Sequence, residues 1–305
     1  MRPLVLRSFA KINLGLEVLG TRQDGYHELR TIFQTIDLHD DIVLKPKRKP
    51  AGVTVKCTHP LVPTDGTNLA AKAAEALRRL TRRDDGVEIT ITKRIPVAGG
   101  LGGGSSNAAA VLMGLDRLWK LGLGPAGLHP LAARLGADVP YFLSGGTALG
   151  LARGDEIYPL NLQVKAQIVL VDPERPVSTA AVFRRVDAEL TPRENSYTIF
   201  RFVSRHLEGS VAFGALKNDL ERAALEEAPE LAEKVQRIRS VLNREGAQLA
   251  SLSGSGSAYF GLFDDPSRAR RARAALTADG FRAVQSRTVS LERYRRIWSD
   301  FGGRR

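Results

Sequence analysis

Cysteine and aromatic residues are scarce in this 305-residue sequence, in which Cys57 is the single cysteine and aromatics make up 6% of the chain. One cysteine cannot form an intrachain disulfide or a cysteine-based zinc site, and such usage is typical of a reducing cytoplasm. His39, His59, His129 and His206 show no metal-ligand spacing. We therefore expect a cytoplasmic protein whose side chains build no metal site.

Long apolar runs are also missing. No segment approaches the roughly 18–20 apolar residues that a membrane span needs. The apolar stretch within Met1–Arg7 is too short for a signal peptide and is typical of the start of a strand. We expect no membrane association.

Positive charge is in excess, because 45 Lys and Arg residues outnumber 33 Asp and Glu residues and give a formal net charge of +12. This balance indicates polyanionic partners, namely nucleotides, phosphorylated metabolites or nucleic acid. The densest basic segments are Arg268–Arg273, which also fits a solvated helix face, and Arg293–Arg305, which matches no motif. Nucleic-acid-binding proteins more usually interleave basic residues with stacking aromatics. Net charge alone does not distinguish among these classes of partner.

Alternating and helical segments follow one another without a regular β–α–β repeat, which predicts an α+β protein. Residues 3–57 favour strands with turns at 20–25 and 45–52. Helices are expected at 68–80, 106–118, 127–135, 178–189, 194–207, 229–245 and 266–278, and further strands at 87–92, 166–171, 249–252, 258–263 and 283–289. The irregular segment 155–165 indicates a domain boundary, with domains at 1–160 and 161–305.

The most informative segment is Gly99–Ser106, Gly-Gly-Leu-Gly-Gly-Gly-Ser-Ser, between the strand expected at 87–92 and the helix expected from Ser106. Five glycines let backbone N–H groups turn inward and form a nest for anionic oxygens. The N-terminus of the following helix adds its dipole and its unpaired N–H donors. Ser105 and Ser106 can cap this helix, and their hydroxyls can also reach phosphate or magnesium. The segment predicts a phosphate site.

Common phosphate and nucleophile motifs do not describe this loop. A Walker A loop needs lysine where Ser105 stands. The dinucleotide pattern Gly-x-Gly-x-x-Gly fails after Gly100 and after Gly102, and its literal match, Gly122–Gly127, contains a proline and lies between two expected helices. The sequence has no Gly-x-Ser-x-Gly nucleophile elbow. The loop is of a third type.

Pro96–Ala109 resembles the phosphate loop of the superfamily of galactokinase, homoserine kinase, mevalonate kinase and phosphomevalonate kinase, the GHMP kinases. Ser8–Leu14 is similar to the N-terminal substrate motif of that superfamily, and Leu252–Ala258 to its C-terminal glycine motif. Asp24–Leu29 and Gly136–Pro140 are similar to one member family, the 4-diphosphocytidyl-2-C-methyl-D-erythritol kinases. The motifs occur in the order of the family, so the resemblance covers essentially the whole chain.

The resemblance implies a two-domain GHMP kinase fold, with an N-terminal domain like the second domain of ribosomal protein S5 and a C-terminal ferredoxin-like domain. It implies phosphorylation of the 2-hydroxyl of 4-diphosphocytidyl-2-C-methyl-D-erythritol in the non-mevalonate route to isopentenyl diphosphate. ATP would be the co-substrate and would bring Mg²⁺ with it. We expect direct in-line transfer between small molecules, without nucleic acid, and leave the oligomeric state open.

Phosphoryl transfer to an alcohol needs a proton acceptor and compensation for the charge of the moving group. Asp138 lies in a Gly-Ala-Asp-Val-Pro turn, where an aspartate can accept a proton or simply cap the turn. Lys11 shares a strand face with Phe9 and Asn13, and such a lysine is otherwise a solvated charge on an edge strand. The resemblance implies that Asp138 is the base, that Lys11 lies beside it and keeps it ionised, and that Asn13 orients the substrate.

Tyr26 and His27 are the residues that point to a pyrimidine. A base can stack on an aromatic ring, and a histidine in the same turn can hydrogen-bond the cytosine edge. Phe183 resembles the second stacking aromatic of the family and would close a sandwich on the base. Phe183 fits equally well as a phenylalanine of the hydrophobic core. Tyr26 fits equally well as an aromatic ring that packs within its own turn.

The resemblance also assigns residues to the ATP side: Asn68, Lys93, Pro96, Val97, Ala98, Gly99, Gly100, Leu101, Gly102, Gly103, Gly104, Ser105 and Ser106. Asn68 fits equally well as the cap of the helix that follows it. Gly254, Ser255 and Gly256 are expected to pack behind the phosphate loop, where close backbone approach demands glycine.

Two other functions stay open. A sister kinase acting on mevalonate, homoserine or a sugar would leave Tyr26 and His27 without a role. A basic nucleic-acid-binding module on an S5-like fold would bind RNA in a salt-dependent way and independently of ATP.

Overall fold

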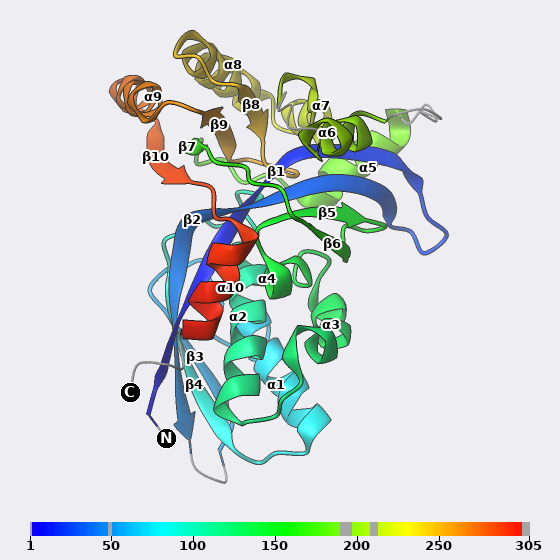
Figure 1. The fold of residues 1–305 in the computed structure, drawn as a ribbon, viewed down its shortest axis with the longest axis vertical. Coiled ribbons are helices and arrows are strands. Elements are labelled where there is room, and N and C mark those ends of the chain that lie inside the picture. The colour runs from blue at the N-terminus through cyan, green and yellow to red at the C-terminus, as the bar shows by residue number, and fades with distance from the viewer. Residues whose placement is uncertain (1, 48–50, 190–196, 208–212, 301–305) are drawn as a thin grey trace.

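The computed structural model describes residues 2–47, 51–189, 197–207 and 213–300. Two long antiparallel strands, β1 (Leu4–Thr21) and β2 (His27–Lys47), run through the length of the molecule (Figure 1). The middle of β1 is buried on both faces, which explains why its residues from Ala10 to Val18 hardly touch solvent. This ribbon carries side chains into both halves of the molecule.

The N-terminal half is built on a six-stranded sheet in the order β3–β4–β2–β5–β6, with β1 paired to β2. Its remaining strands are β3 (Val53–Cys57), β4 (Gly86–Thr92), β5 (Thr147–Leu151) and β6 (Glu156–Leu160). Its helices are α1 (Leu69–Thr81), α2 (Gly103–Leu118), α3 (Gly124–Leu135) and the short α4 (Tyr141–Ser144). The helices cover one face of the sheet (Figure 1), and small residues of α2, such as Ala108 and Gly114, let it lie close to β1 and β2.

The C-terminal half contains a four-stranded antiparallel sheet in the order β10–β7–β9–β8. Its strands are β7 (Gln167–Asp172), β8 (Leu249–Leu252), β9 (Tyr259–Phe263) and β10 (Arg282–Arg287). Its helices are α5 (Thr179–Glu189), α6 (Thr198–Leu207), α7 (Leu220–Glu227), α8 (Pro229–Arg244) and α9 (Pro266–Ala278). This order of elements and strands is the split β–α–β arrangement of ferredoxin-like folds.

The last helix, α10 (Leu291–Asp300), returns to the N-terminal half and lies beside α2 and α4 (Figure 1). The Tyr294 hydroxyl donates to the carbonyl of Phe142 at 2.5 Å, and the Tyr294 ring packs against Phe9 with centroids 5.7 Å apart. A Cβ on Gly145 would strike the Tyr294 ring, so the turn after α4 needs glycine there. Helix α10 thereby joins the N-terminal half.

Most predicted elements are confirmed to within a few residues, and the strand at 249–252 and the helix at 266–278 have the expected bounds. The helix after the glycine-rich loop begins at Gly103 and not at Ser106, because the loop tightens directly into helical backbone. The sequence analysis did not predict β5, β6, α4, α7 or α10. The expected helix at 194–207 begins partly outside the described residues, and α6 starts at Thr198.

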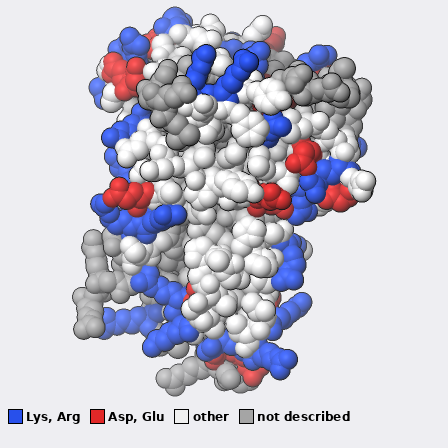
Figure 2. Space-filling view, turned by 45° about the vertical axis from the view of Figure 1, so that its right-hand side comes forward, with Lys and Arg blue, Asp and Glu red and all other residues white. Residues whose placement is uncertain are grey.

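The surface in Figure 2 bears on the excess of positive charge. Lys and Arg side chains are spread around this face with acidic side chains among them, and much of its middle is uncharged. On this face the charge does not form the continuous basic stripe that nucleic-acid-binding surfaces show. In the described part of the chain, no helix is both long and apolar enough to cross a membrane.

Candidate active site

A lysine and an aspartate from distant parts of the chain meet at the centre of the molecule. Lys11 Nζ, on β1, lies 3.3 Å from Asp138 Oδ2, on the loop between α3 and α4. The Lys11 side chain is 4% exposed and that of Asp138 is 33% exposed. Lys11 is therefore not a solvated edge charge, and Asp138 is the member of the pair that solvent or a ligand can reach.

A chain of hydrogen bonds fixes the Lys11 ammonium. Lys11 Nζ donates to Asn13 Oδ1 at 2.7 Å, and Asn13 Nδ2 donates to Thr31 Oγ1 at 2.8 Å. The Thr31 hydroxyl donates in turn to the Gly15 carbonyl at 2.7 Å. Because all three side chains are buried on the β1–β2 ribbon, the lysine has little freedom to leave Asp138.

The glycine-rich loop packs against both halves of the molecule. Gly100 and Gly102 have left-handed backbone, with φ of 71° and 68°. A Cβ on Gly100 would clash with the Ser253 carbonyl oxygen, and one on Gly102 would lie 2.7 Å from Cζ of Phe142. Both positions therefore require glycine for conformation and for space.

The two serines after the loop differ in exposure. Gly102 is the N-cap of α2 and makes no side-chain hydrogen bond, so neither Ser105 nor Ser106 caps this helix. Ser106 is buried and accepts a hydrogen bond from the Ser8 hydroxyl at 2.8 Å. Ser105 lines the cavities described below. Ser105 is therefore the serine whose hydroxyl can meet a ligand.

A second lysine–aspartate pair lies behind the loop. Asp40 is fully buried and accepts from Lys93 Nζ at 2.9 Å and from the backbone N–H groups of Arg94 and Ile95 at 2.7 and 2.9 Å. The Asn107 amide, oriented to satisfy its neighbours, donates to Asp40 Oδ2 at 3.1 Å and to the Gly103 carbonyl at 3.2 Å. Burial lowers the pKa of the Lys93 amine, and the Asp40 charge opposes that shift.

The C-terminal glycine motif touches the phosphate loop and the first lysine. Ser253 Oγ donates to the Gly100 carbonyl at 3.0 Å, and Ala258 N donates to the Gly99 carbonyl at 3.1 Å. A Cβ on Gly254 would lie 3.2 Å from Asn13 Oδ1 and 3.5 Å from Lys11 Nζ. The motif thus approaches the Lys11 group as well as the loop.

The aromatic residues lie on the far side of the Lys11–Asp138 pair. The rings of His27 and Phe183 are in contact, with centroids 4.6 Å apart. Tyr26 is 56% exposed, and the Arg153 guanidinium lies 5.0 Å from the centre of its ring. Arg153 is itself held by Asp155. Tyr26 is therefore not a ring packed inside its turn.

Two cavities meet at the phosphate loop. The larger, about 710 Å³, contains Lys11, Asn13, Asp138 and the three aromatic-site residues Tyr26, His27 and Phe183. The smaller, about 360 Å³, is lined by Asn68, Lys93 and the loop from Pro96 to Ser105. Both include Gly100, Gly102 and Ser105. The substrate-side residues therefore line the larger cavity and most ATP-side residues the smaller one, and the two cavities meet at Gly100, Gly102 and Ser105, whereas Ser106 lines neither.

Several residues of the site were not named from the sequence. They are Ser8, Thr31, Asp40, Asn107, Arg153, Thr179, Arg184 and Asn218, which bond to the motifs or line the larger cavity. Asn218 donates to the Gly254 carbonyl at 2.7 Å from a point 36 residues away. Such contacts leave no local pattern, because each depends on how distant segments meet.

Comparison with known proteins identifies the family. The family models described as GHMP kinases N terminal domain and GHMP kinases C terminal match residues 68–146 and 211–282. A 4-diphosphocytidyl-2-C-methyl-D-erythritol kinase of Gloeobacter violaceus is 42% identical over 285 residues, which cover 92% of each chain. The chain belongs to the 4-diphosphocytidyl-2-C-methyl-D-erythritol kinase family. A relative of the same name from Citrifermentans bemidjiense is 42% identical over 95% of this chain and 100% of its own.

Solved structures agree with the architecture described above. A crystal structure of 4-(cytidine 5'-diphospho)-2C-methyl-D-erythritol kinase is 36% identical, has a TM-score of 0.76, and covers 93% of this chain and 99% of its own. Homoserine kinase from Cytophaga hutchinsonii shares the fold, with a TM-score of 0.74 at 18% identity and 95% coverage of both chains. The predicted α+β GHMP kinase fold is confirmed, and the protein is a small-molecule kinase with ATP as its co-substrate.

Proposed function

We propose that this kinase transfers the γ-phosphoryl group of ATP to the 2-hydroxyl of 4-diphosphocytidyl-2-C-methyl-D-erythritol, in the non-mevalonate route to isopentenyl diphosphate. The observation that carries the proposal is the Lys11–Asp138 pair at the junction of the two cavities, with an aromatic group on the side away from the phosphate loop. The names of the relatives support the choice of substrate.

In this proposal Asp138 takes the hydroxyl proton as the alcohol oxygen attacks the γ-phosphorus directly, with no phospho-enzyme. Its partly exposed carboxylate faces the cavity, and a positioned base of this kind contributes about 10²–10⁴-fold. Lys11 compensates the negative charge that collects between base and phosphoryl group. Asn13 fixes Lys11 and has its own amide at the edge of the cavity, where it orients the substrate.

On the ATP side, the N–H groups at the start of α2 and the left-handed glycines Gly100 and Gly102 bind the phosphates. Asn68 and Lys93 lie on the walls of this cavity. Mg²⁺ arrives with ATP, since it keeps phosphate and water ligands readily. Within the described residues no three His, Cys, Asp or Glu side chains gather as a metal site, and Ser105 supplies the hydroxyl nearest to the phosphates.

The cytidyl group of the substrate fits the aromatic end of the larger cavity. Bases stack about 3.4 Å apart, so a base between two rings needs about twice that distance. The His27 and Phe183 rings, 4.6 Å apart, are too close to hold it between them. We place the cytosine between Tyr26 and Phe183, with His27 at its edge, and the diphosphate near Arg184, which lines the same cavity.

In this proposal the chain has two domains, and the substrate contacts both of them. ATP is bound by a domain of residues 1–160, and the domain of residues 161–305 supplies Phe183 and the glycine motif Gly254–Gly256. Support for this division comes from the separate sheets, β1–β6 and β7–β10. Helix α10 packs on the first of these sheets although it lies in the second segment.

ADP release with Mg-ATP tests the proposal, with 4-diphosphocytidyl-2-C-methyl-D-erythritol, mevalonate, homoserine and galactose offered separately. We expect turnover of the cytidyl substrate alone, and a loss of about 10²–10⁴-fold in Asp138→Asn with ATP binding retained. Asp85→Asn is the matched control, since Asp85 pairs with Arg83 at the surface and lines neither cavity. Preference for another alcohol would refute the substrate, and an active Asp138→Asn enzyme would refute the base.

A further inference from the structure

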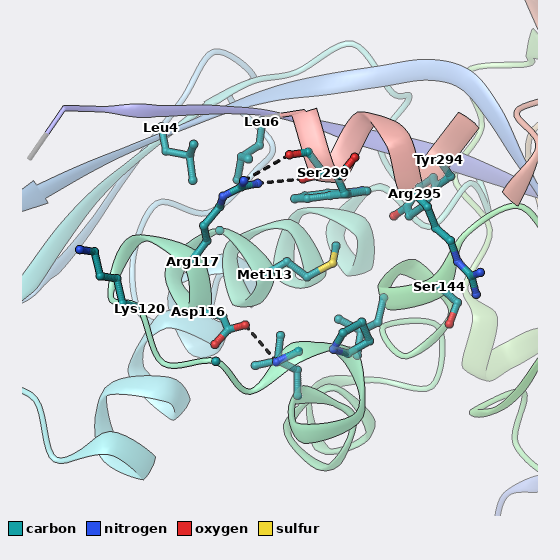
Figure 3. Close-up of a pocket in the computed structure, with 17 residues that line it drawn as sticks. Leu4, Leu6, Met113, Asp116, Arg117, Lys120, Ser144, Tyr294, Arg295 and Ser299 are labelled. Carbon is teal, nitrogen blue, oxygen red and sulfur yellow. Dashed lines mark hydrogen bonds between the residues drawn. The ribbon is translucent and has the colours of Figure 1, made fainter. Parts of the chain in front are cut away.

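A third cavity, of about 850 Å³, is larger than either cavity of the candidate active site. It lies at the C-terminal end of α2, the helix whose N-terminus carries the phosphate loop, and α3, α4, β1 and α10 complete its walls (Figure 3). Its volume falls within the roughly 300–1,000 Å³ of small-molecule sites. None of the residues assigned above to ATP or substrate lines it.

The inside of this cavity is apolar. Six side chains from five elements form most of the wall: Leu4, Leu6, Met113, Leu128, Leu143 and Trp298. Met113 adds adaptability, because its unbranched thioether side chain fills irregular spaces. Gly114 lets α2 pack closely on β1 and β2 at the base of the cavity, since a Cβ there would strike the side chains of Leu6 and Leu44. A ligand that fills this space must present hydrocarbon to it.

The rim is basic. Arg117 donates to the carbonyls of Trp298 and Ser299 at 2.9 and 3.2 Å, so its charge is held over the cavity by neutral partners (Figure 3). Lys120 and Arg295 also line the cavity, and no carboxylate of the described residues forms an ion pair with any of these three cations. The one acid, Asp116, accepts from the backbone N–H groups of Leu123 and Gly124 at 2.9 and 3.1 Å.

We propose that this cavity binds an amphiphilic anion, a hydrocarbon chain that ends in a phosphate or a carboxylate. The chain lies among the apolar side chains, and the anionic head lies at the rim with Arg117, Lys120 and Arg295. Burial of apolar area drives the binding, and the three uncompensated cations select the charge of the head.

The same cavity touches the elements that position the catalytic residues. Leu143 and Ser144, on its wall, belong to α4, which follows Asp138 after two residues. The neighbouring Phe142 packs its ring against Gly102 of the phosphate loop and accepts from Tyr294 of α10. A ligand in this cavity therefore contacts α4 and α10, which adjoin the Asp138 loop and the phosphate loop, and we expect its occupancy to change turnover.

Calorimetric titration of the full chain with monomeric dodecyl phosphate tests the site, and it does not depend on the substrate proposed above. We expect binding about tenfold tighter than that of dodecanol, which corresponds to ~1.4 kcal/mol, and no binding of dodecyltrimethylammonium. Lys120→Glu/Arg295→Glu should remove the preference for the anion. Arg270→Glu/Arg273→Glu, the same charge change on exposed positions of α9, should keep it.

Equal affinity of the protein for dodecanol and dodecyl phosphate would overturn the proposal. Equal affinity of the two double variants for dodecyl phosphate would also overturn it. Met113→Trp fills the cavity and should abolish binding while thermal unfolding shows a folded protein. The protein is also tested with phosphatidylglycerol vesicles. If it sediments with the vesicles and does not bind monomeric dodecyl phosphate, the ligand is a lipid surface, and the assignment to a free amphiphile is overturned. Turnover unchanged at saturating dodecyl phosphate would overturn the link to the active site.

Discussion

At the scale of single residues, each of the two lysines beside the phosphate loop is paired with an aspartate. Asp138, the partner of Lys11, is 33% exposed, whereas Asp40, the partner of Lys93, is fully buried. A carboxylate that reaches the cavity can exchange a proton with a substrate. A carboxylate that four donors surround in the interior instead fixes the segments that carry those donors.

The buried pair yields a prediction about stability. Asp40→Asn leaves the Lys93 ammonium buried without its counter-charge, and such changes cost about 3–5 kcal/mol. Combining it with Lys93→Met should recover part of that loss, since no unpaired charge remains. Chemical denaturation of the two single variants and the double variant measures both effects. Asp41→Asn is the control, because its pair with Arg94 is at the surface and contributes little. Equal losses in Asp40→Asn and Asp41→Asn would contradict the prediction.

The lowered pKa of Lys93 also predicts a pH dependence. Burial lowers this pKa in the folded state below the ordinary value of 10.5. Between the two values the folded protein has lost a proton that the unfolded chain still holds, so the free energy of unfolding rises with pH in that window. The wild type minus Lys93→Met difference in unfolding free energy, measured across alkaline pH, should show this rise. A flat difference would mean that Lys93 titrates alike in both states.

At the scale of elements, the phosphate loop depends on glycine at some positions and not at others. Gly100→Ala places a methyl group against the Ser253 carbonyl and puts alanine at a positive φ, which it rarely adopts. We therefore expect lower stability and weaker ATP binding. Gly104 is the second residue of α2, and a Cβ there would meet only Leu69 Cδ1, at 3.6 Å. Gly104→Ala should therefore stabilise the protein by about 0.5–1 kcal/mol. Thermal unfolding of the two variants measures their stability, and titration with ATP measures binding. A stable Gly100→Ala protein with normal ATP binding would refute the argument.

The elements that the sequence predicted are those with a strong local pattern. Helix α9 has proline at its start, and its N-cap Asp265 accepts a hydrogen bond from Ser267 N. Strands β8 and β9 are short apolar runs between turns. Helix α10 was not predicted, because its sequence is rich in arginine and its apolar residues Leu291, Tyr294, Ile297 and Trp298 stand among charged ones. The partners of this helix are found only in the folded chain, where α10 meets Phe9 of β1 and Phe142 of α4.

The candidate site divides in the same way. Glycine density, the Asp138 turn and the Tyr26–His27 pair are local in the sequence, and the resemblance placed them in one site. Their partners Thr31, Asn218 and Asp40 are ordinary polar residues within strands or loops. The hydrogen bonds that assign them a place join residues 18, 36 and 55 positions apart. No pattern in one sequence distinguishes such residues from solvated ones.

At the scale of the whole molecule, the β1–β2 ribbon connects the hydrophobic cores. Leu6 belongs to the cluster under α1, α2 and α3, and Leu16 and Val18 belong to the cluster under α7 and α8. Between them Ile12 and Leu14 pack with side chains of β7 and β9. One continuous pair of strands thus contributes to every large core cluster. Separate unfolding of either half would expose part of this ribbon, so we expect the chain to unfold as one cooperative unit.

A core substitution far from a fluorescent probe tests that expectation. Leu242 lies on the buried face of α8 in the C-terminal half, and Leu242→Ala should destabilise the protein by about 2–5 kcal/mol. In a Trp298→Phe background, Trp119 is the only tryptophan and reports on the N-terminal core. If the halves unfold together, the denaturant midpoint seen by Trp119 fluorescence falls with that seen by circular dichroism. Val284→Ala, on a partly exposed strand, should move neither. A Trp119 transition that stays in place would mean that the ribbon does not couple the two cores.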